Sequence, residues 1–177
     1  MTKSWLVSIL VVLVGGFFAS SLLADDTLVK FKGGLGVHPV SNISGAQNAN
    51  GSFPDVTRNV VRGVDPAGQL WVIDKLDANV KTNGDIKVKG KGLILGGGNN
   101  AGRATGQSIF ATLICEAAAP FTLRSTNSSG VPLSASGDFE IDDVLAPWPS
   151  ADCASPMLII RNASGGTWFA VGIPDLD

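Results

Sequence analysis

The chain has 177 residues, which is enough for one domain with a substantial hydrophobic core. Its net charge of −2 argues against nucleic acid or a strongly anionic surface as the partner. Charged residues form only 16% of the chain and there are 22 glycines, a composition that fits many short strands joined by turns.

The amino terminus has the pattern of a secretion signal. Lys3 provides a short positive region, residues 5–18 are apolar, and small residues follow up to Ala24. This pattern predicts that residues 1–24 are a signal peptide, with cleavage after Ser21 as the alternative. The apolar run is shorter than the roughly 20 residues that a membrane span needs. We therefore expect a secreted or periplasmic protein with no membrane span once the signal is removed.

The first part of the mature chain contains candidate strands on either side of a long polar segment. Residues 28–32 and residues 59–64 predict short strands. Between them, residues 41–55 are rich in Ser, Asn and Gly and predict a long surface loop. Because long loops in compact domains are either functional or mobile, Asn48 and Asn50 in this loop are candidate ligand-binding residues.

Residues 70–95 predict a long β-hairpin, around which the rest of the chain is organised. Residues 75–82 and 85–91 both alternate between apolar and polar side chains, which is the period-two pattern of strands with one buried face. The three lysines of the second strand then form a solvated face, and an anion-binding stripe is the alternative interpretation.

The turn chemistry decides the register of this hairpin. A two-residue turn would pair Val80 with a lysine and so mix apolar and charged residues on one face. A three-residue turn pairs Val80 with Ile86 and gives Gly84 the left-handed conformation that such turns need. This register also places the unlike charges of Asp77 and Lys89 opposite each other, which stabilises the strand pair.

The second half of the chain continues the strand pattern. The glycine-rich residues 96–106 lack both the spacing and the following helix of a nucleotide-binding loop, so they predict a mobile turn. Residues 108–114 are apolar on both faces, which predicts a strand in the centre of a sheet. Further strands are expected at residues 121–124, 138–145, 157–160 and 167–173, with an irregular loop at residues 146–156.

The chain has two cysteines, Cys115 at the end of the predicted central strand and Cys153 in the irregular loop. An even number of cysteines in an exported protein predicts a disulfide. That bridge would close a loop of about 38 residues and stabilise the fold by roughly 4 kcal/mol. Two cysteines and one histidine do not make a set of zinc ligands, so we expect no metal site and no cofactor.

The residues that most catalytic mechanisms need are scarce. His38 is the only histidine, and no Gly-x-Ser-x-Gly turn is present, so no residue is assigned a catalytic role. Asp138, Glu140 and Asp142 lie on one face of a predicted strand and are interpreted as its solvent side. A hydrolase that uses a pair of carboxylates remains an alternative.

Asp74 falls on the apolar side of its predicted strand, between Val72 and Leu76. This position predicts a buried carboxylate, which would need a cationic partner. A structural ion pair is the simpler interpretation and functional use the alternative. The candidate partners are Arg58, Arg62 and Arg161.

The tryptophans divide into two groups. Trp71 and Trp168 lie in apolar strands and are expected in the core, whereas Trp148 lies in a proline-flanked loop and is expected to be exposed. An exposed indole ring offers a surface on which a sugar ring stacks. Trp148, together with the 41–55 loop, is therefore the candidate ligand-binding site.

These patterns predict an all-β protein in which residues 25–177 form a single β-sandwich or flattened barrel of about nine to eleven mostly antiparallel strands. The predicted function is that of an exported, non-catalytic protein that binds a protein or glycan partner, or assembles, at the cell envelope or outside the cell. A carbohydrate- or small-ligand-binding module is the first alternative, and a carboxylate-dependent hydrolase is the second. A large exposed apolar patch would favour assembly.

Overall fold

A computed structural model describes residues 26–175, and within that range every helix or strand assigned is a strand, so the all-β prediction is confirmed. The predicted signal peptide lies outside the described residues. The strands are β1 (Thr27–Gly36), β2 (Val40–Ser44), β3 (Asp55–Arg58), β4 (Trp71–Val72), β5 (Lys75–Lys81), β6 (Asp85–Lys91), β7 (Ile94–Leu95), β8 (Ser108–Ile114), β9 (Arg124–Ser125), β10 (Val131–Pro132), β11 (Phe139–Val144), β12 (Met157–Asn162) and β13 (Trp168–Asp175). Their number exceeds the predicted nine to eleven because four of them are two-residue pieces. Among the described residues, no helix has the length and apolar character needed to cross a membrane.

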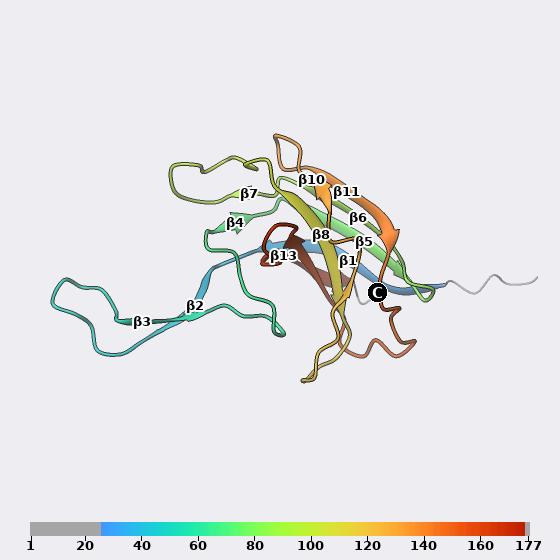
Figure 1. Cartoon of the computed structure of the whole chain (residues 1–177), viewed down its shortest axis with the longest axis horizontal. Coiled ribbons are helices and arrows are strands. Elements are labelled where there is room, and N and C mark those ends of the chain that lie inside the picture. The colour runs from blue at the N-terminus through green and yellow to red at the C-terminus, as the bar shows by residue number, and fades with distance from the viewer. Residues whose placement is uncertain (1–25, 176–177) are drawn as a thin grey trace, which may run out of the picture.

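One sheet forms the body of the molecule. Its strand order is β10-β8-β12-β13-β1-β5-β6-β11, with β9 also paired to β8. The two ends of this sheet meet, because Ser125 of β9 exchanges two backbone hydrogen bonds of 2.9 Å with Ala146, just after β11. The sheet therefore curls into a nearly closed barrel, which we call the body (Figure 1).

The predicted central hairpin is present with the predicted register. Val80 pairs with Ile86 across β5 and β6, and Gly84 in the turn has a φ of 88°. The hairpin continues beyond a short break as the β4–β7 pair, in which Trp71 lies opposite Leu95. The pleat turns the apolar side chains of β5 and β6 into the core, where they are buried.

The outer face of this part of the sheet carries rows of unlike charges. Asp77 lies opposite Lys89 as predicted, but the Lys89 ammonium forms its ion pair with Glu140 of β11, at 3.3 Å. One row along, Lys87 contacts Asp142 of β11 at 2.9 Å. Lys87 and Lys89 are thus paired with acidic residues of β11 on a solvent-exposed face. This pairing favours the solvated face over the alternative interpretation, an anion-binding stripe.

The hydrophobic core lies inside the barrel and on both faces of β8 and β12. Six of the seven residues of β8 are buried, which confirms its prediction as a central strand. Trp71 and Trp168 are buried as predicted, and the Trp71 ring stacks on Phe169 with ring centroids 4.1 Å apart.

The predicted disulfide is present. Cys115, directly after β8, is bonded to Cys153 in the 146–156 loop, with 38 residues of sequence separation. The Ser155 backbone N–H also donates to the Cys115 carbonyl at 3.0 Å. The bridge thus fixes an irregular loop to the end of the most buried strand.

Of two predictions about the chain before the central hairpin, one is wrong and the other is correct only in part. Residues 59–64, expected as a strand, form a tight turn in which Val61 and Val64 exchange two backbone hydrogen bonds. The loop expected at residues 41–55 spans only residues 45–54, because residues 41–44 and Asp55 belong to a two-stranded hairpin made of β2 and β3. This hairpin forms a sheet of its own, separate from the sheet of the body.

Candidate functional site

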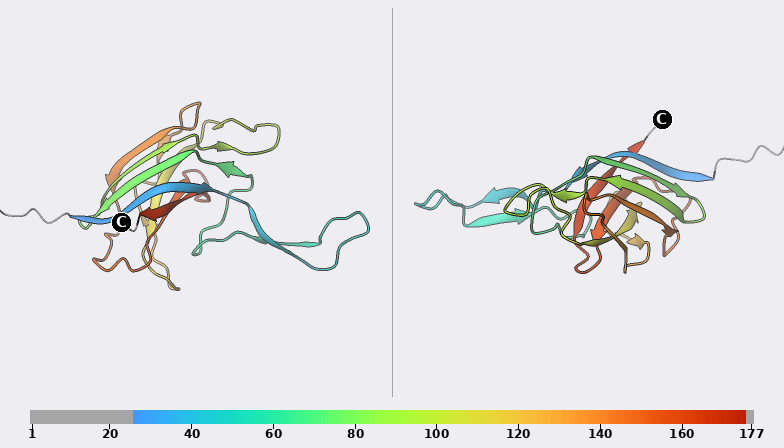
Figure 2. Two further views of the ribbon diagram at one scale, coloured as in Figure 1. Left: turned by 180° about the vertical axis from the view of Figure 1, so that it is seen from behind. Right: turned by 90° about the horizontal axis from the view of Figure 1, so that it is seen from above.

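The β2–β3 hairpin projects away from the body, and we call residues 40–58 the arm. Figures 1 and 2 show it extending well beyond the barrel, with its tip far from any other element. All nine residues of β2 and β3 are exposed. The arm is therefore a sheet of two strands with neither face covered.

The arm nevertheless has an apolar face. Ile43 lies directly opposite Val56, and directly paired residues point to the same side of a sheet. A bulge between Val40 and Asn42 brings Val40 opposite Arg58, two residues from Val56 and so on the same face. Without this bulge, Val40 would point away from Ile43, because side chains alternate along a strand.

The opposite face of the arm is polar, because Asn42 pairs with Thr57 and Ser44 pairs with Asp55. The ribbon is thus amphipathic, like a strand pair that packs on a core. Here the apolar face is bare: Val40, Ile43 and Val56 retain 42%, 47% and 57% of their surface. Such a face indicates a surface that another molecule covers.

The tip of the arm is held by its own polar groups. The Asn48 side-chain amide donates to the Ser52 hydroxyl at 3.1 Å, and the side-chain oxygen of Asn50 accepts from the Ser52 backbone N–H at 3.0 Å. The predicted binding residues Asn48 and Asn50 are therefore exposed but are engaged in shaping this loop.

Hydrogen bonds fix the root of the arm to the body. Arg58 donates to the Pro66 carbonyl at 2.6 Å, and the side-chain amide of Asn59 donates to the His38 carbonyl at 3.0 Å. The Trp168 indole N–H donates to the Asn59 carbonyl at 3.0 Å. These three bonds, one of them from a buried tryptophan of β13, together hold the root of the arm on the body.

A groove of about 560 Å³ lies beside this root. Its apolar wall is formed by Leu35, which is 62% exposed, and by Trp71, Val72 and Ile73. His38 is the only residue in its lining that can carry a charge. Like the arm, the groove offers apolar surface that nothing in the described chain covers.

A second candidate site lies at the other end of the molecule, around Trp148. This side chain is 71% exposed, as predicted, and packs over the hairpin turn, where a methyl group on Gly84 would stand 3.2 Å from its Cδ1. The neighbouring Val144 lines a polar pocket of about 550 Å³. The polar lining consists of Asn79, Lys81, Asp85, Lys87, Asp142 and Asp143.

The carboxylates of this pocket are already engaged. Asp142 is paired with Lys87, and this hydrogen bond raises the pKa of Lys87. Asp143 accepts from the backbone N–H groups of Asn127 and Val144, at 2.8 Å each. Both carboxylates therefore act as hydrogen-bond acceptors that hold neighbouring parts of the body together.

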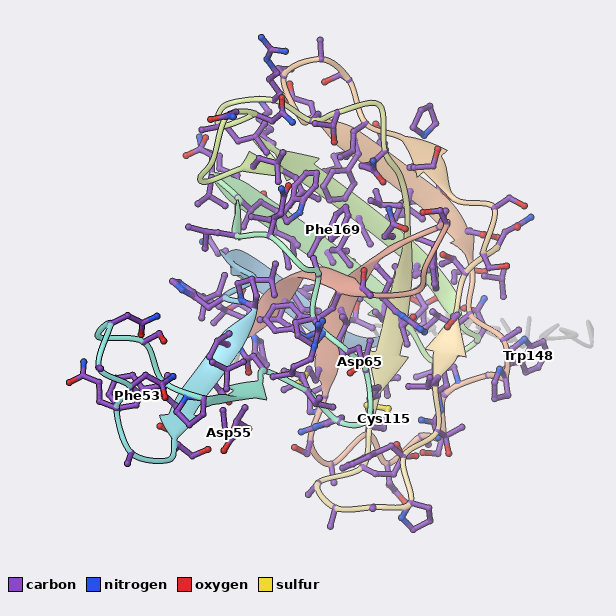
Figure 3. The ribbon with its side chains drawn as sticks, turned by 60° about the vertical axis from the view of Figure 1, so that its left-hand side comes forward. Phe53, Asp55, Asp65, Cys115, Trp148 and Phe169 are labelled. Atoms are coloured by element: carbon purple, nitrogen blue, oxygen red, sulfur yellow. A yellow bond between two sulfur atoms is a disulfide. The ribbon has the colours of Figure 1, made fainter. Side chains whose placement is uncertain are left out.

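Two predicted features of the site are wrong. Trp148 and the arm tip, marked by Phe53, lie on opposite sides of the molecule, so Trp148, Asn48 and Asn50 do not form one site (Figure 3). Asp74 is exposed, because the strand is interrupted between β4 and β5 and the alternation restarts there. Its expected partners, Arg58, Arg62 and Arg161, donate to backbone carbonyls.

An ion pair that the sequence did not indicate joins Glu116 to the buried Arg124, with an N–O distance of 2.8 Å. The hydrogen bond from Arg124 lowers the pKa of Glu116 from 4.5 to about 2. A lowered pKa means that the pair stabilises the fold above pH 4.5 and that this contribution is lost as the pH falls toward 2.

We expect Glu116→Gln to lower the free energy of unfolding at pH 7 by about 1–2 kcal/mol, allowing for the partial exposure of Glu116. Between pH 4.5 and pH 2 the variant will lose less stability than the unchanged chain. Urea unfolding at pH 7 and pH 3 measures both effects. Glu140→Gln, which removes an exposed ion pair, is the control, and an equal loss in both variants would contradict the argument.

Among residues 26–175, no group of three or more His, Cys, Asp or Glu side chains is placed to hold a metal ion. Comparison with known proteins adds no assignment, since no family model, curated protein or solved structure matches this chain. The fold and the sites thus define a disulfide-bonded, barrel-like all-β protein with a projecting amphipathic arm.

Proposed function

We propose that this chain is an exported, non-catalytic protein that binds a protein partner, or assembles, at the cell envelope or outside the cell, and that the arm is its contact surface. The observation that carries this proposal is the bare apolar face of the arm, formed by Val40, Ile43 and Val56.

Covering the apolar face of the arm is energetically favourable. An isolated two-stranded hairpin is at best marginally stable in water. Full burial of one Val or Ile side chain contributes roughly 1.5–3 kcal/mol, and about half of that remains available on each of the three residues. A partner that covers the face therefore stabilises both the hairpin and the complex.

Export is supported by the amino-terminal pattern and by the disulfide, because such bonds persist mainly in oxidising compartments. A non-catalytic role is supported by the engagement of Asp142 and Asp143 in fixed bonds.

The test is a capture experiment from the extracellular fraction of the producing cells, with three baits. The first is the chain from Asp25, and the second is Ile43→Lys/Val56→Asp, which puts a cross-strand ion pair on the apolar face. The third is the matched control Asn42→Lys/Thr57→Asp, which puts the same pair on the polar face. We expect one polypeptide that the first and third baits enrich at least about tenfold over the second, as a hot-spot contact requires. Equal recovery by all three baits would refute the role of the arm.

A second candidate function, carbohydrate binding, is favoured by the exposure of Trp148 beside the polar pocket. A sugar stacks its C–H face on an aromatic ring and uses both donors and acceptors, which Lys81 and Asp85 supply here. Binding of glycans on an array should be lost in Trp148→Ala and largely kept in Trp148→Phe. An array with no glycan above background would remove this candidate.

A further inference from the structure

We propose that the molecule that covers the arm is a second copy of this chain, with the arm of each copy lying in the groove at the root of the partner's arm. This inference rests on the proposed function and adds the identity of the partner. The structural basis is that one chain presents two uncovered apolar surfaces side by side, the arm face and the groove.

The arm of a chain does not reach its own groove. The bonds of Arg58 to Pro66 and of Asn59 to His38 hold the root, and the arm then runs outward from the body (Figures 1 and 2). Ile43 is therefore carried away from Leu35 and Val72, which form the groove wall. Whatever fills the groove comes from another molecule or another segment.

The areas favour a reciprocal contact. A stable interface needs about 800 Å² from each partner. The four apolar side chains of the arm, Val40, Ile43, Phe53 and Val56, are only 38–57% exposed. Together they offer a few hundred Å², so arms stacked only on each other would bury too little. If the two copies exchange arms, each copy contributes both an arm and a groove. The buried area is then roughly twice that of two arms stacked on each other.

The charges permit two identical surfaces to meet. On the apolar face of the arm, the guanidinium of Arg58 is already bonded to Pro66, and the facing groove carries only His38 as an ionisable group. Arg58 keeps its positive charge, but the groove lining contains no lysine, arginine or carboxylate, so the groove sets no fixed like charge against an incoming arm.

A twofold axis gives both copies the same contact. A twofold axis that puts one arm into the partner's groove puts the other arm into the first groove by the same operation. The strand β2 has five residues, about 17 Å of extended chain, which each copy can present to the partner's groove. One closed dimer covers both surfaces with no third component.

The experiment is sedimentation equilibrium of the chain from Asp25, with its disulfide intact, at concentrations up to about 100 μM, a range that detects dimers of micromolar Kd. We expect a mass twice that of the monomer. Ile43→Lys/Val56→Asp in the arm and Leu35→Asp in the groove should each halve this mass, and the polar-face control Asn42→Lys/Thr57→Asp should leave it unchanged. Circular dichroism checks that each variant is folded.

A second measurement tests the contact itself. Ile43→Cys/Leu35→Cys should form a covalent dimer on mild oxidation, and Asn42→Cys/Leu35→Cys should not. A monomeric unchanged chain, or a dimer that survives the arm variant or Leu35→Asp, would overturn the exchange. These results are distinguishable from failure of the proposed function, because capture of a different polypeptide through the arm would leave that function standing.

Discussion

Replacing Cys115 and Cys153 by alanine will lower the free energy of unfolding by about 4 kcal/mol. The bridge closes a chain segment of 38 residues, and its removal frees the unfolded chain to explore many more conformations. For a chain of this length the melting temperature should fall by roughly 8–16 °C.

Urea unfolding measures this loss, and reduction of the unchanged chain by dithiothreitol is the control, because it breaks the same bond without a substitution. Both should give the same drop. The slope of the free energy against urea should rise, since an unfolded chain without the cross-link exposes more surface. A loss below about 1 kcal/mol would contradict the chain-entropy account.

The parts of the fold that were predicted correctly are those in which local pattern and turn chemistry agree. Strands β5 and β6 alternate cleanly, and Gly84 permits only certain turns, so their register followed from the sequence. The two-sided apolar pattern of β8 likewise identified a central strand, and Cys115 directly after it identified the disulfide.

The failures occurred where a bulge or a strand break interrupts the local alternation. In the arm, Val40 and Ile43 lie three residues apart and do not alternate, and only the bulge at Ser41 places them on one face. A bulge leaves no recognisable mark in a polar segment, so the amphipathic ribbon looked like a loop. The apolar content of Ile43, Phe53 and Val56 was the one available signal.

Asp74 and its expected arginine partners failed for a related reason. The alternation that placed Asp74 in the core assumed one continuous strand, but the chain breaks between β4 and β5. Pattern alone also gives no sign that an arginine will cap backbone carbonyls. Arg62 illustrates this, since its partners lie 52 and 93 residues away in the chain.

Arg62→Ala will lower the free energy of unfolding by about 2–4 kcal/mol, because it removes three hydrogen bonds from a charged, half-buried side chain. The guanidinium donates to the Ile114 carbonyl at 3.2 Å and to the carbonyl and hydroxyl of Ser155 at 2.6 and 2.7 Å. It therefore ties the turn at residues 61–64 to the end of β8 and to the loop that carries Cys153.

Arg62 has a φ of 47°, a backbone conformation that costs roughly 1 kcal/mol for a residue with a Cβ atom. Two further variants separate the effect of this strain from the effect of the lost hydrogen bonds. Arg62→Gly removes the bonds and the strain together, so it should be about 1 kcal/mol more stable than Arg62→Ala. Arg62→Lys keeps the charge but loses the forked geometry, so it should fall between alanine and arginine. Urea unfolding ranks the four chains, and an alanine variant as stable as the unchanged chain would show that the turn is held by packing alone.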